Sequence, residues 1–289
     1  MDTVHRFLFE DLDIRGALVQ LGPAWHQLQA VRDYEAPVRR LLGELAAVTT
    51  IIGCNLKQPG RLSFHLRGEG AVRLLVMECD EQLRLRGLAK IADAVPLEPT
   101  FSDRDLLGTG QLVLTLQTNA AAEHPYQSYV PLEGDNLAAI FEHYLAQSEQ
   151  APARLWLAAD EHHACALFLQ KLPNADKRDP DGWNRVQHLA ATLKPVDLAL
   201  PPETLLTRVF PEETLRLFDA QPVSYHCPRD EEKVIDMLRA LGRDEVEAAL
   251  ADTGAISIHD DICNHEYRFG REVLEHLFDE PPAAPHTLH

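Results

Sequence analysis

The sequence lacks the short motifs that mark the common enzyme sites. It contains no Gly-rich loop that ends in Gly-Lys-Ser or Gly-Lys-Thr, no Gly-x-Gly-x-x-Gly after a strand, no Gly-x-Ser-x-Gly and no His-Glu-x-x-His. Without these motifs the chain offers no phosphate cradle and no nucleophile set. We therefore expect a protein that is not an enzyme and that uses no nucleotide or organic cofactor.

Positive charge and long apolar runs are also scarce. The 289 residues include 27 Lys and Arg against 45 Asp and Glu, which gives a net charge of −18. Such a chain repels phosphate backbones and anionic lipid, so nucleic acid and membranes are not expected partners. No run approaches the roughly 20 apolar residues of a membrane span, and residues 1–22 show no charged-then-apolar leader. We expect a cytoplasmic protein.

Cysteine is sparse, with five residues in the chain. An odd number in a chain long enough for a large core argues against a secreted disulfide framework. Cys54, Cys79 and Cys165 have apolar or strand-like neighbours, which favours buried and unreactive thiols. The chain has no Cys-x-x-Cys pair, and a thiol oxidoreductase needs that pair at a helix N-terminus. Cys227 and Cys263 remain as the candidates for redox or metal chemistry.

The N-terminal part of the chain has the patterns of an α+β fold. A content of 45% apolar residues allows a large core. Apolar residues at three- and four-residue steps predict a long helix over 36–56 with one face in the core, and a second long helix is expected over 136–148. Short connections between the strand-like segments predict antiparallel sheets. The expected strands are 4–10, 13–19, 61–67, 72–77, 83–91, 112–117, 127–131, 154–159 and 164–170.

A charged segment with two helix breakers, 174–185, divides the chain. The elements expected after it are helices over 183–193, 202–210, 230–241, 244–250 and 272–278, and strands over 215–218, 255–259 and 267–269. The predicted organisation is an N-terminal α/β domain over 1–173, a helical linker region over 174–218 and a small helix and hairpin domain over 219–289. We expect the tail 281–289 to be disordered.

The C-terminal part also gathers chemically competent side chains. Residues 219–289 hold 16 acidic and 6 basic residues, so this quarter of the chain carries −10 of the net −18. A charge asymmetry of this kind marks a distinct unit. Two thiols and three imidazoles bracket one compact segment of it, 223–269. They belong to His226, Cys227, His259, Cys263 and His265.

This segment resembles the heat-shock protein 33 family of redox-regulated bacterial holdase chaperones, and the resemblance covers nearly the whole chain. Its most specific part is Leu132-Glu133-Gly134-Asp135 with Leu137-Ala138, followed by Ser148-Glu149-Gln150 with Pro152 and Arg154. His5 to Glu10 and Arg15-Gly16 resemble the opening hairpin of the family. The resemblance implies an N-terminal α/β domain, a helical linker that unfolds on activation and a small C-terminal domain.

In that family a Cys-x-Cys pair and a Cys-x-x-Cys pair hold one zinc ion, and each pair closes to a disulfide when zinc leaves. The resemblance places Cys227 and Cys263 at the first and last of these positions, with Arg229 at the second and Asp260 at the third. Neither local disulfide can form in this chain. The resemblance therefore implies holdase activity with a lost or altered zinc and disulfide switch.

Two interpretations of the site stay open. In the first, Cys227 and Cys263 keep a zinc ion with other ligands. The available ligands are His226, His259, Asp260 and His265. In the second, the site is a metal-free remnant in which Arg229 and Asp260, of opposite charge, form an ion pair. Cys227 and Cys263 would then lie near enough to form a single disulfide, which constrains the domain rather than releasing it.

The expected function is that of an ATP-independent holdase of the stress response, which binds unfolded or partly folded client proteins. Its activity would be constitutive, or governed by heat or partner binding, instead of by peroxide. Two alternatives stay open, a redox-regulated chaperone that retains zinc and a scaffold with the family fold that binds one specific partner. A homodimer also stays open.

Overall fold

The computed structural model describes residues 1–56, 58–92, 97–98, 100–118, 125–148 and 150–279. These residues form an α+β structure, as the sequence predicted, and divide into two compact units, Met1–His226 and Cys227–His289. The sequence predicted three regions, with boundaries after residues 173 and 218. These two boundaries stay predictions. The tail 281–289 lies outside the described residues. No helix in the described ranges is long and apolar enough to cross a membrane.

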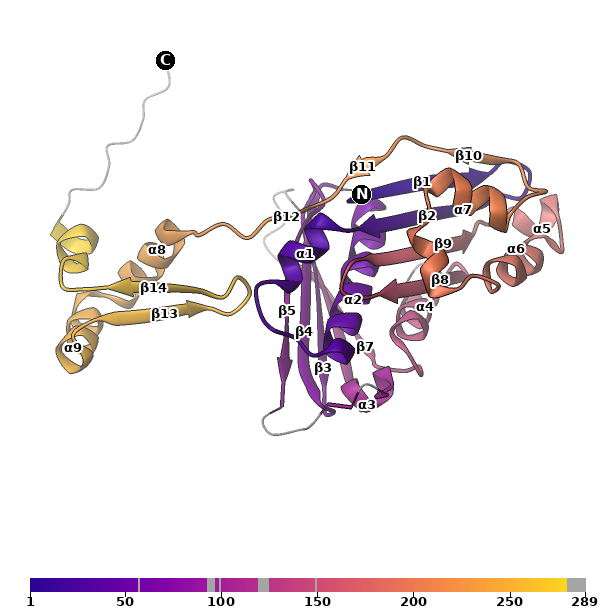
Figure 1. Ribbon diagram of the computed structural model, residues 1–289. Helices are drawn as coiled ribbons and strands as arrows, with labels where there is room; N and C mark the ends of the chain where they lie inside the picture. Colours follow the sequence, from indigo (N-terminus) through magenta and orange to yellow (C-terminus); the bar gives the residue numbers. More distant parts are fainter. Residues whose placement is uncertain (57, 93–96, 99, 119–124, 149, 280–289) are drawn as a thin grey trace, which may run out of the picture. The chain divides into compact units, whose positions relative to one another are not determined.

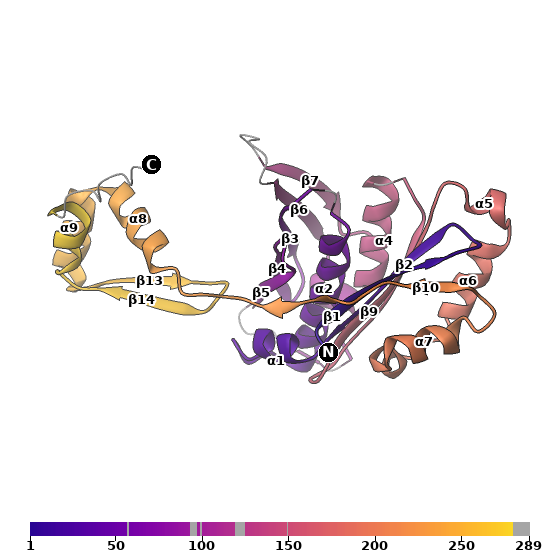
Figure 2. The same cartoon turned by 90° about the horizontal axis from the view of Figure 1, so that it is seen from above.

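Helix α2, Ala36–Cys54, lies between two sheets of the first unit (Figures 1 and 2). Pro37 stands in its first turn, where the N–H that proline lacks would have no partner in the helix. Every residue from Leu41 to Ile51 is buried, so this part of the helix is covered all round. The sequence predicted the helix but only one buried face, because the periodicity of a single helix does not show a second sheet packed on its other side.

The polar residues in the buried part of α2 have partners. Thr49 and Thr50 are weak helix formers. Their hydroxyls donate to the carbonyls of Leu45 and Ala46, at 2.7 and 2.9 Å. The C-terminal half of α2 can therefore stay helical in an apolar environment without an unpaired hydroxyl.

The first sheet is antiparallel and has the strand order β10-β1-β2-β9-β8, with β11 also paired to β1. Its strands within the described chain are β1 (Thr3–Phe9), β2 (Ile14–Leu21), β8 (Ala153–Ala159), β9 (Ala164–Lys171), β10 (Leu215–Leu217) and β11 (Gln221–Pro222). One face of this sheet packs on α2 through residues such as Val19 and Phe168. Its other face carries Phe7 and Phe9, which belong to a second core.

The second sheet has the order β12-β5-β4-β3-β6-β7 and packs on the opposite side of α2. Its described strands are β3 (Gly60–Gly68), β4 (Val72–Cys79), β5 (Arg84–Ile91), β6 (Gly110–Thr118), β7 (Tyr126–Pro131) and β12 (Ser224–Tyr225). Helix α4, Leu137–Ser148, joins α2 in the space between the sheets. There Phe141 meets Phe64 of β3 edge to face, with ring centroids 4.9 Å apart. Such a pair adds to the free energy gained by burial.

The predicted linker region packs over the second core of the first sheet. Its helices are α5 (Ala175–Arg178), α6 (Gly182–Ala190), the 3-10 helix η1 (Pro195–Ala199) and α7 (Pro202–Val209). Val186 of α6 and Leu205 of α7 are buried in the core that contains Phe7 and Phe9. The buried side chain of Gln20 donates from Nε2 to the carbonyls of Leu198 and Leu200, at 2.7 and 2.6 Å. The region is thus fastened to β2 by both apolar and polar contacts.

The second unit contains two helices, a hairpin and a final π-helical turn in its described part. These are α8 (Glu231–Leu241), α9 (Arg243–Thr253), β13 (Ile256–Asp260), β14 (His265–Phe269) and η2 (Glu275–Asp279). They share a small core with Leu238, Leu250 and Tyr267 among its buried members. The predicted helices and hairpin of this unit are confirmed within a few residues.

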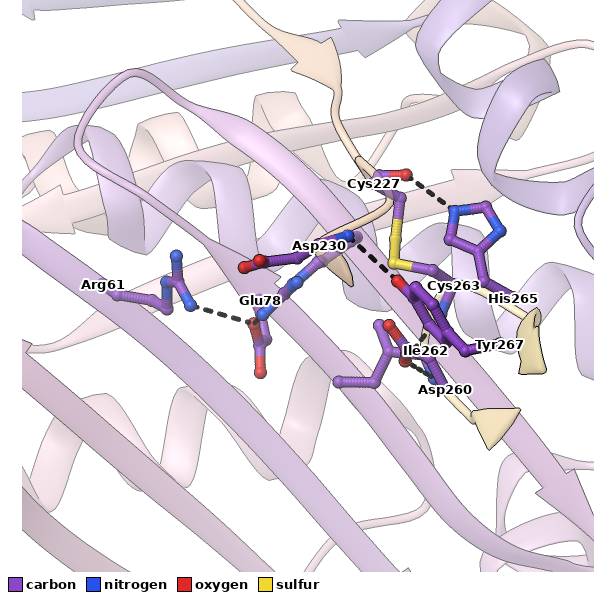
Figure 3. The surroundings of a disulfide bond; sticks show 10 residues. Arg61, Glu78, Cys227, Asp230, Asp260, Ile262, Cys263, His265 and Tyr267 are labelled. Carbon is purple, nitrogen blue, oxygen red and sulfur yellow. Dashed lines mark hydrogen bonds and ion pairs between the residues drawn. A yellow bond between two sulfur atoms is a disulfide. The ribbon is translucent and has the colours of Figure 1, made fainter. Parts of the chain in front are cut away.

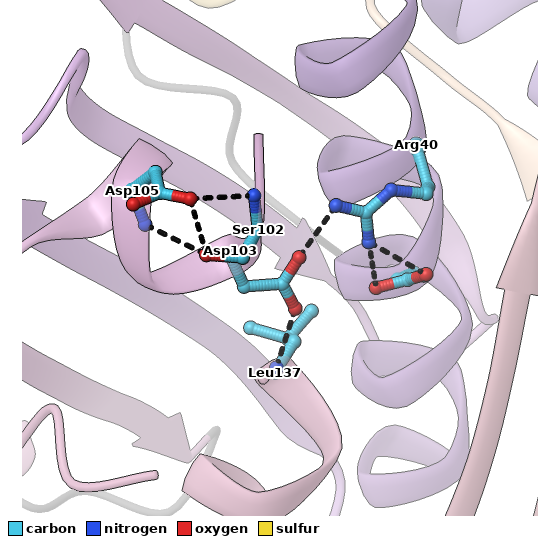
Figure 4. Close-up of polar contacts among 6 residues, drawn as sticks. Arg40, Ser102, Asp103, Asp105 and Leu137 are labelled. Atoms are coloured by element: carbon cyan, nitrogen blue, oxygen red, sulfur yellow. Dashed lines mark hydrogen bonds and ion pairs between the residues drawn. The ribbon is translucent and has the colours of Figure 1, made fainter. Parts of the chain in front are cut away.

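An ionic cluster with two buried carboxylates connects α2, α4 and the short helix α3, Asp103–Leu107 (Figure 4). Arg40 lies 2.6 Å from Asp103 and 3.2 Å from Glu44, measured between guanidinium nitrogens and carboxylate oxygens. The second oxygen of Asp103 accepts the N–H of Leu137 at 2.7 Å, at the start of α4, where a carboxylate is favourable. The cluster therefore fixes the N-termini of α3 and α4 against the first half of α2.

Burial and the nearby carboxylate of Asp103 raise the pKa of Glu44 from 4.5 to about 7, against the opposing charge of Arg40. An acid whose pKa is raised by folding stabilises the fold fully below its unfolded pKa, and that contribution is lost as the pH rises through the folded pKa. The stability supplied by protonated Glu44 should therefore decline between about pH 4.5 and 7.

Replacing Glu44 with Gln removes this titration. The free energy of unfolding of Glu44→Gln, relative to that of the parent chain, should rise by about 1 to 3 kcal/mol between about pH 5 and 8. Denaturant unfolding followed by tryptophan fluorescence measures this difference. Glu133→Gln, at an exposed carboxylate, is the matched control and should follow the parent profile. A relative stability that falls over the same interval would show that the attraction of Arg40 outweighs burial.

Candidate functional site in the C-terminal unit

The candidate site begins where the second unit begins. Cys227 and Cys263 are joined by a disulfide, with Cα atoms 5.6 Å apart (Figure 3). Cys263 lies in the tight loop between β13 and β14 and is 3% exposed. The bond closes a loop over a sequence separation of 36 residues that contains α8, α9 and β13. It ties the start of the unit to the tip of its hairpin.

Asp260 shapes the loop that presents Cys263. Its Oδ1 accepts the N–H of Ile262 at 2.9 Å and that of Cys263 at 3.2 Å, as an aspartate does in a tight turn. Asn264 then takes a φ of 55°, in the left-handed region that asparagine tolerates better than most residues. These two residues allow β13 to return as β14 after a short loop. The carboxylate of Asp260 is thus a structural group of the turn.

Arg229 contacts β14 instead of Asp260. Its Nη2 donates to the carbonyl of Glu266, and its guanidinium carbon lies 5.6 Å from the centre of the Tyr267 ring. The expected ion pair between Arg229 and Asp260 is therefore wrong. Sequence positions alone suggested that opposite charges would meet, whereas the backbone of the turn and the face of an aromatic ring supply both groups with other partners.

The histidines of the segment are dispersed. His265 donates from Nε2 to the carbonyl of Cys227 at 3.1 Å, which adds a polar contact beside the disulfide. His259 is exposed and its Nε2 lies 3.9 Å from Asp261 Oδ1. His226 belongs to the first unit, where its backbone N–H donates to the carbonyl of Leu85 at 3.0 Å. Among the described residues, the His265 ring is the one imidazole of this segment that hydrogen-bonds to a bridged cysteine.

These groups do not fit a zinc ion in this arrangement. The two sulfurs are bonded to each other, and a thiolate ligand needs a free sulfur. Asp260 Oδ1 accepts two backbone N–H groups, and the Nε2 of His265 carries the proton that it donates. Within the described ranges no group of three or more His, Cys, Asp or Glu side chains is placed to hold a metal.

Two further contacts at this site were not expected from the sequence. The hydroxyl of Tyr267 accepts the N–H of Asp230 at 3.0 Å, and Asp230 in turn accepts the N–H of Lys233 at the start of α8. An aspartate directly before Glu-Glu-Lys is a recognisable helix N-cap signal. The role of Tyr267 has no such local signal, because it depends on how the hairpin packs against residues 37 positions away.

The three other cysteines carry free thiols and belong to the first unit. Cys79 and Cys165 are buried, as predicted, whereas Cys54 is half-buried. Burial raises the pKa of Cys54 to about 11 and that of Cys165 to about 12, and it raises the pKa of Cys79 further. A thiol must lose its proton to act as a nucleophile, so these groups are poorly suited to thiol chemistry at neutral pH.

Comparison with solved structures identifies a protein with a similar fold. The crystal structure of the 33 kDa chaperonin (heat shock protein 33 homolog) from Thermotoga maritima superposes with a TM-score of 0.82, over 96% of this chain and 98% of that one. Because the two sequences are only 19% identical, this likeness concerns the fold alone. It defines the chain as a protein with the architecture of that chaperonin.

Comparison with sequences then gives the family. A family model described as "Hsp33 protein" matches residues 2–270. A protein of Nitrosococcus oceani named "33 kDa chaperonin" is 41% identical over 290 residues, which span 99% of this chain and 97% of that one. A protein of Methylobacillus flagellatus with the same name is 39% identical over 98% of this chain and 97% of its own length. The chain belongs to the Hsp33 family, and this membership supports a chaperone role.

The disulfide yields a test that concerns the second unit alone. Replacing both partners, Cys227→Ser and Cys263→Ser, should lower the stability of this unit by about 3 to 4 kcal/mol, because the open chain regains the entropy that the bridge removed. Hydrogen exchange measured by mass spectrometry on peptides from 227–279 reports this change. Reductant should have the same effect on the parent chain and none on the double variant.

The matched control is Cys54→Ser, which alters a free thiol and leaves the bridge in place. This variant should retain the full response of peptides 227–279 to reductant. Equal exchange in the bridged and unbridged forms would show that the disulfide does not stabilise the unit.

Proposed function

We propose that this chain is an ATP-independent holdase that binds unfolding proteins and prevents their aggregation. Membership of the Hsp33 family and the names of its relatives support a chaperone role. The observation that carries the finer proposal is the apolar outer face of the first sheet, which is covered by short helices. A surface of this kind can bind exposed apolar segments once its cover moves.

The covering helices have little stability of their own. Helices α6 and α7 have nine and eight residues, and isolated helices shorter than about 12 to 15 residues are marginal in water. They hold their shape by burying residues such as Val186 and Leu205 against Phe7 and Phe9. An unfolding client that offers apolar side chains to the same face competes with this packing. The region 174–218 is accordingly proposed as the mobile element of the chaperone.

The redox response is proposed to be altered relative to the two-disulfide switch that the resemblance implies. Arg229 and Asp260 bind the β14 backbone and the hairpin turn, and Cys227 and Cys263 form a single bridge. This bridge closes a loop inside the C-terminal unit, so oxidation would stiffen the unit and reduction would loosen it. We infer that the chaperone works without zinc, in the cytoplasm, and without a peroxide trigger.

An aggregation assay tests the function directly. The purified chain should suppress light scattering by several unrelated heat-denatured proteins in the presence of reductant, and added ATP should not change the result. Addition of peroxide should change the activity by less than about twofold, because Cys227 and Cys263 are the one cysteine pair of the unit that peroxide can convert to a disulfide. Zinc measured on the untagged protein provides an independent check of the metal-free site.

Two outcomes would contradict this proposal in different ways. A step from inactive to active on oxidation would restore the redox-regulated alternative, with zinc held through Cys227, Cys263 and other ligands. Suppression confined to one client would favour a scaffold that binds one specific partner.

Release of the covering helices should raise the activity. Gln20→Leu removes both hydrogen bonds to Leu198 and Leu200 and leaves those carbonyls without their donor, which costs about 1 to 3 kcal/mol. Peptides from 195–209 should exchange hydrogen faster, and less protein should be needed to suppress aggregation. Gln29→Leu is the control, because Gln29 donates to the carbonyl of Glu161 at an exposed site. Faster exchange of 195–209 without a gain in activity would show that this face does not bind clients.

A further inference from the structure

Strand β7 forms one end of the second sheet and has an open outer edge (Figure 2). The sheet order ends in β3-β6-β7, and in the described chain no strand pairs with the side of β7 that faces away from β6. Tyr126 and Tyr129 of this strand are 61% and 58% exposed. An edge of this kind offers its backbone groups to any strand that can approach it.

The hydrogen-bond register shows which backbone groups point outward. The N–H of Leu132 donates to the carbonyl of Gly110, one residue beyond the pairing of Pro131 with Gln111. In an antiparallel pair the hydrogen-bonded residues alternate. Tyr126, Ser128 and Val130 therefore bond to β6, and the intervening residues face the other way. The outward groups are the N–H and carbonyl of Gln127 and Tyr129 and the carbonyl of Pro131, which has no N–H.

The edge lacks the features that usually prevent strand addition. Sheet edges are commonly protected by charged side chains, by proline within the strand or by a bulge. No charged residue occurs from Tyr126 to Pro131, and the single proline is the last residue of the strand. In a chain with a net charge of −18, an uncharged stretch of this kind is suited to an uncharged partner.

A pocket of about 250 Å³ with a mainly apolar lining adjoins the same edge. Side chains alternate across a strand, so Tyr126 shares a face with buried Val130, the face that packs towards α2 and α4. Tyr126 lines the pocket together with Leu116 of β6 and Leu145 of α4. A strand added beside β7 would direct every second side chain to this face, where the pocket can receive one of them.

We propose that β7 is a docking strand for an extended, uncharged and apolar segment of an unfolded client protein. The segment would pair with the backbone of Gln127 and Tyr129 and place one apolar side chain beside Tyr126. This inference rests on the proposed holdase function and adds a second client-binding site to the one proposed on the outer face of the first sheet. A second copy of the chain is a weaker candidate, because the six residues of β7 fall far short of the roughly 20 to 30 residues a side of a stable interface.

A synthetic peptide of alternating valine and threonine, with lysine at both ends for solubility, serves as the probe. On binding to the full chain, the amides of Gln127 and Tyr129 should become protected from hydrogen exchange, while those of Ser128 and Val130 should change little because β6 already pairs them. A matched peptide with proline in place of threonine lacks the donors for a ladder and should not protect them. Unprotected amides of Gln127 and Tyr129 with the probe bound would overturn the inference.

Two variants test the same contact through affinity. Gln127→Pro removes an outward N–H and no backbone hydrogen bond to β6, although the side-chain bond from Gln127 to Thr115 is also lost. Tyr126→Ala removes a wall of the pocket. Each should weaken probe binding about fivefold to tenfold. Phe218→Ala alters another exposed aromatic residue, which lies away from β7, and should bind the probe like the parent chain. Should Gln127→Pro disturb the fold, Tyr126→Ala and the exchange experiment still decide.

Different experimental results would refute the docking strand and the holdase function on which it rests. If the parent chain does not suppress aggregation, the holdase proposal fails. If the parent chain suppresses aggregation and both β7 variants bind the probe as it does, only the docking strand is refuted.

Discussion

Burial of the middle of helix α2, Leu41–Ile51, on every side is the constraint on which the first unit depends. Two sheets cover opposite sides of one helix, so each sheet needs α2 to bury its inner face. At Gly43 a Cβ atom would come within 2.6 Å of the Cβ of Ala159 and 3.1 Å of the Trp25 ring. A contact of this kind leaves no room for a larger residue, and it sets the distance between α2 and the first sheet.

The sequence predicted most of the elements of this architecture, because their signals are local. Both long helices and most of the antiparallel strands follow from periodicity and from short connections. Helix α1, Pro23–Gln29, was not predicted although proline stands in its first turn, and α3 was not predicted although Ser102 and Asp105 form a capping box. Both helices are too short for periodicity to reveal. Strand β12 pairs in parallel with β5, far away in sequence, and no local pattern indicates such a contact.

At the candidate site the sequence identified the residues better than their interactions. The pairing of Cys227 with Cys263 could be stated as an option, since both sulfurs survive at positions that the resemblance brings together. The partners of Arg229 could not, because they depend on the face of Tyr267 and on the backbone of β14. A structural zinc ion contributes on the order of 10 to 16 kcal/mol to the folding of a small domain, and a bridge of this loop length about 3 to 4. The apolar core of the second unit must therefore supply a larger share of the stability of this unit than the core of a zinc-bearing domain does.

The linker region is attached to the first sheet at both ends. Strand β9 precedes the linker helices and strand β10, near the end of the region, follows them; β10 pairs with β1 in the same sheet that contains β9. Helices α5 to α7 thus form a closed loop on the protein, and their return to the sheet is an intramolecular reaction. Tethered groups of this kind act at effective concentrations in the millimolar range. Under the proposed holdase function, a client would compete with a local ligand of that concentration, so the amount of unfolded protein would itself set how often these helices stay away from the sheet.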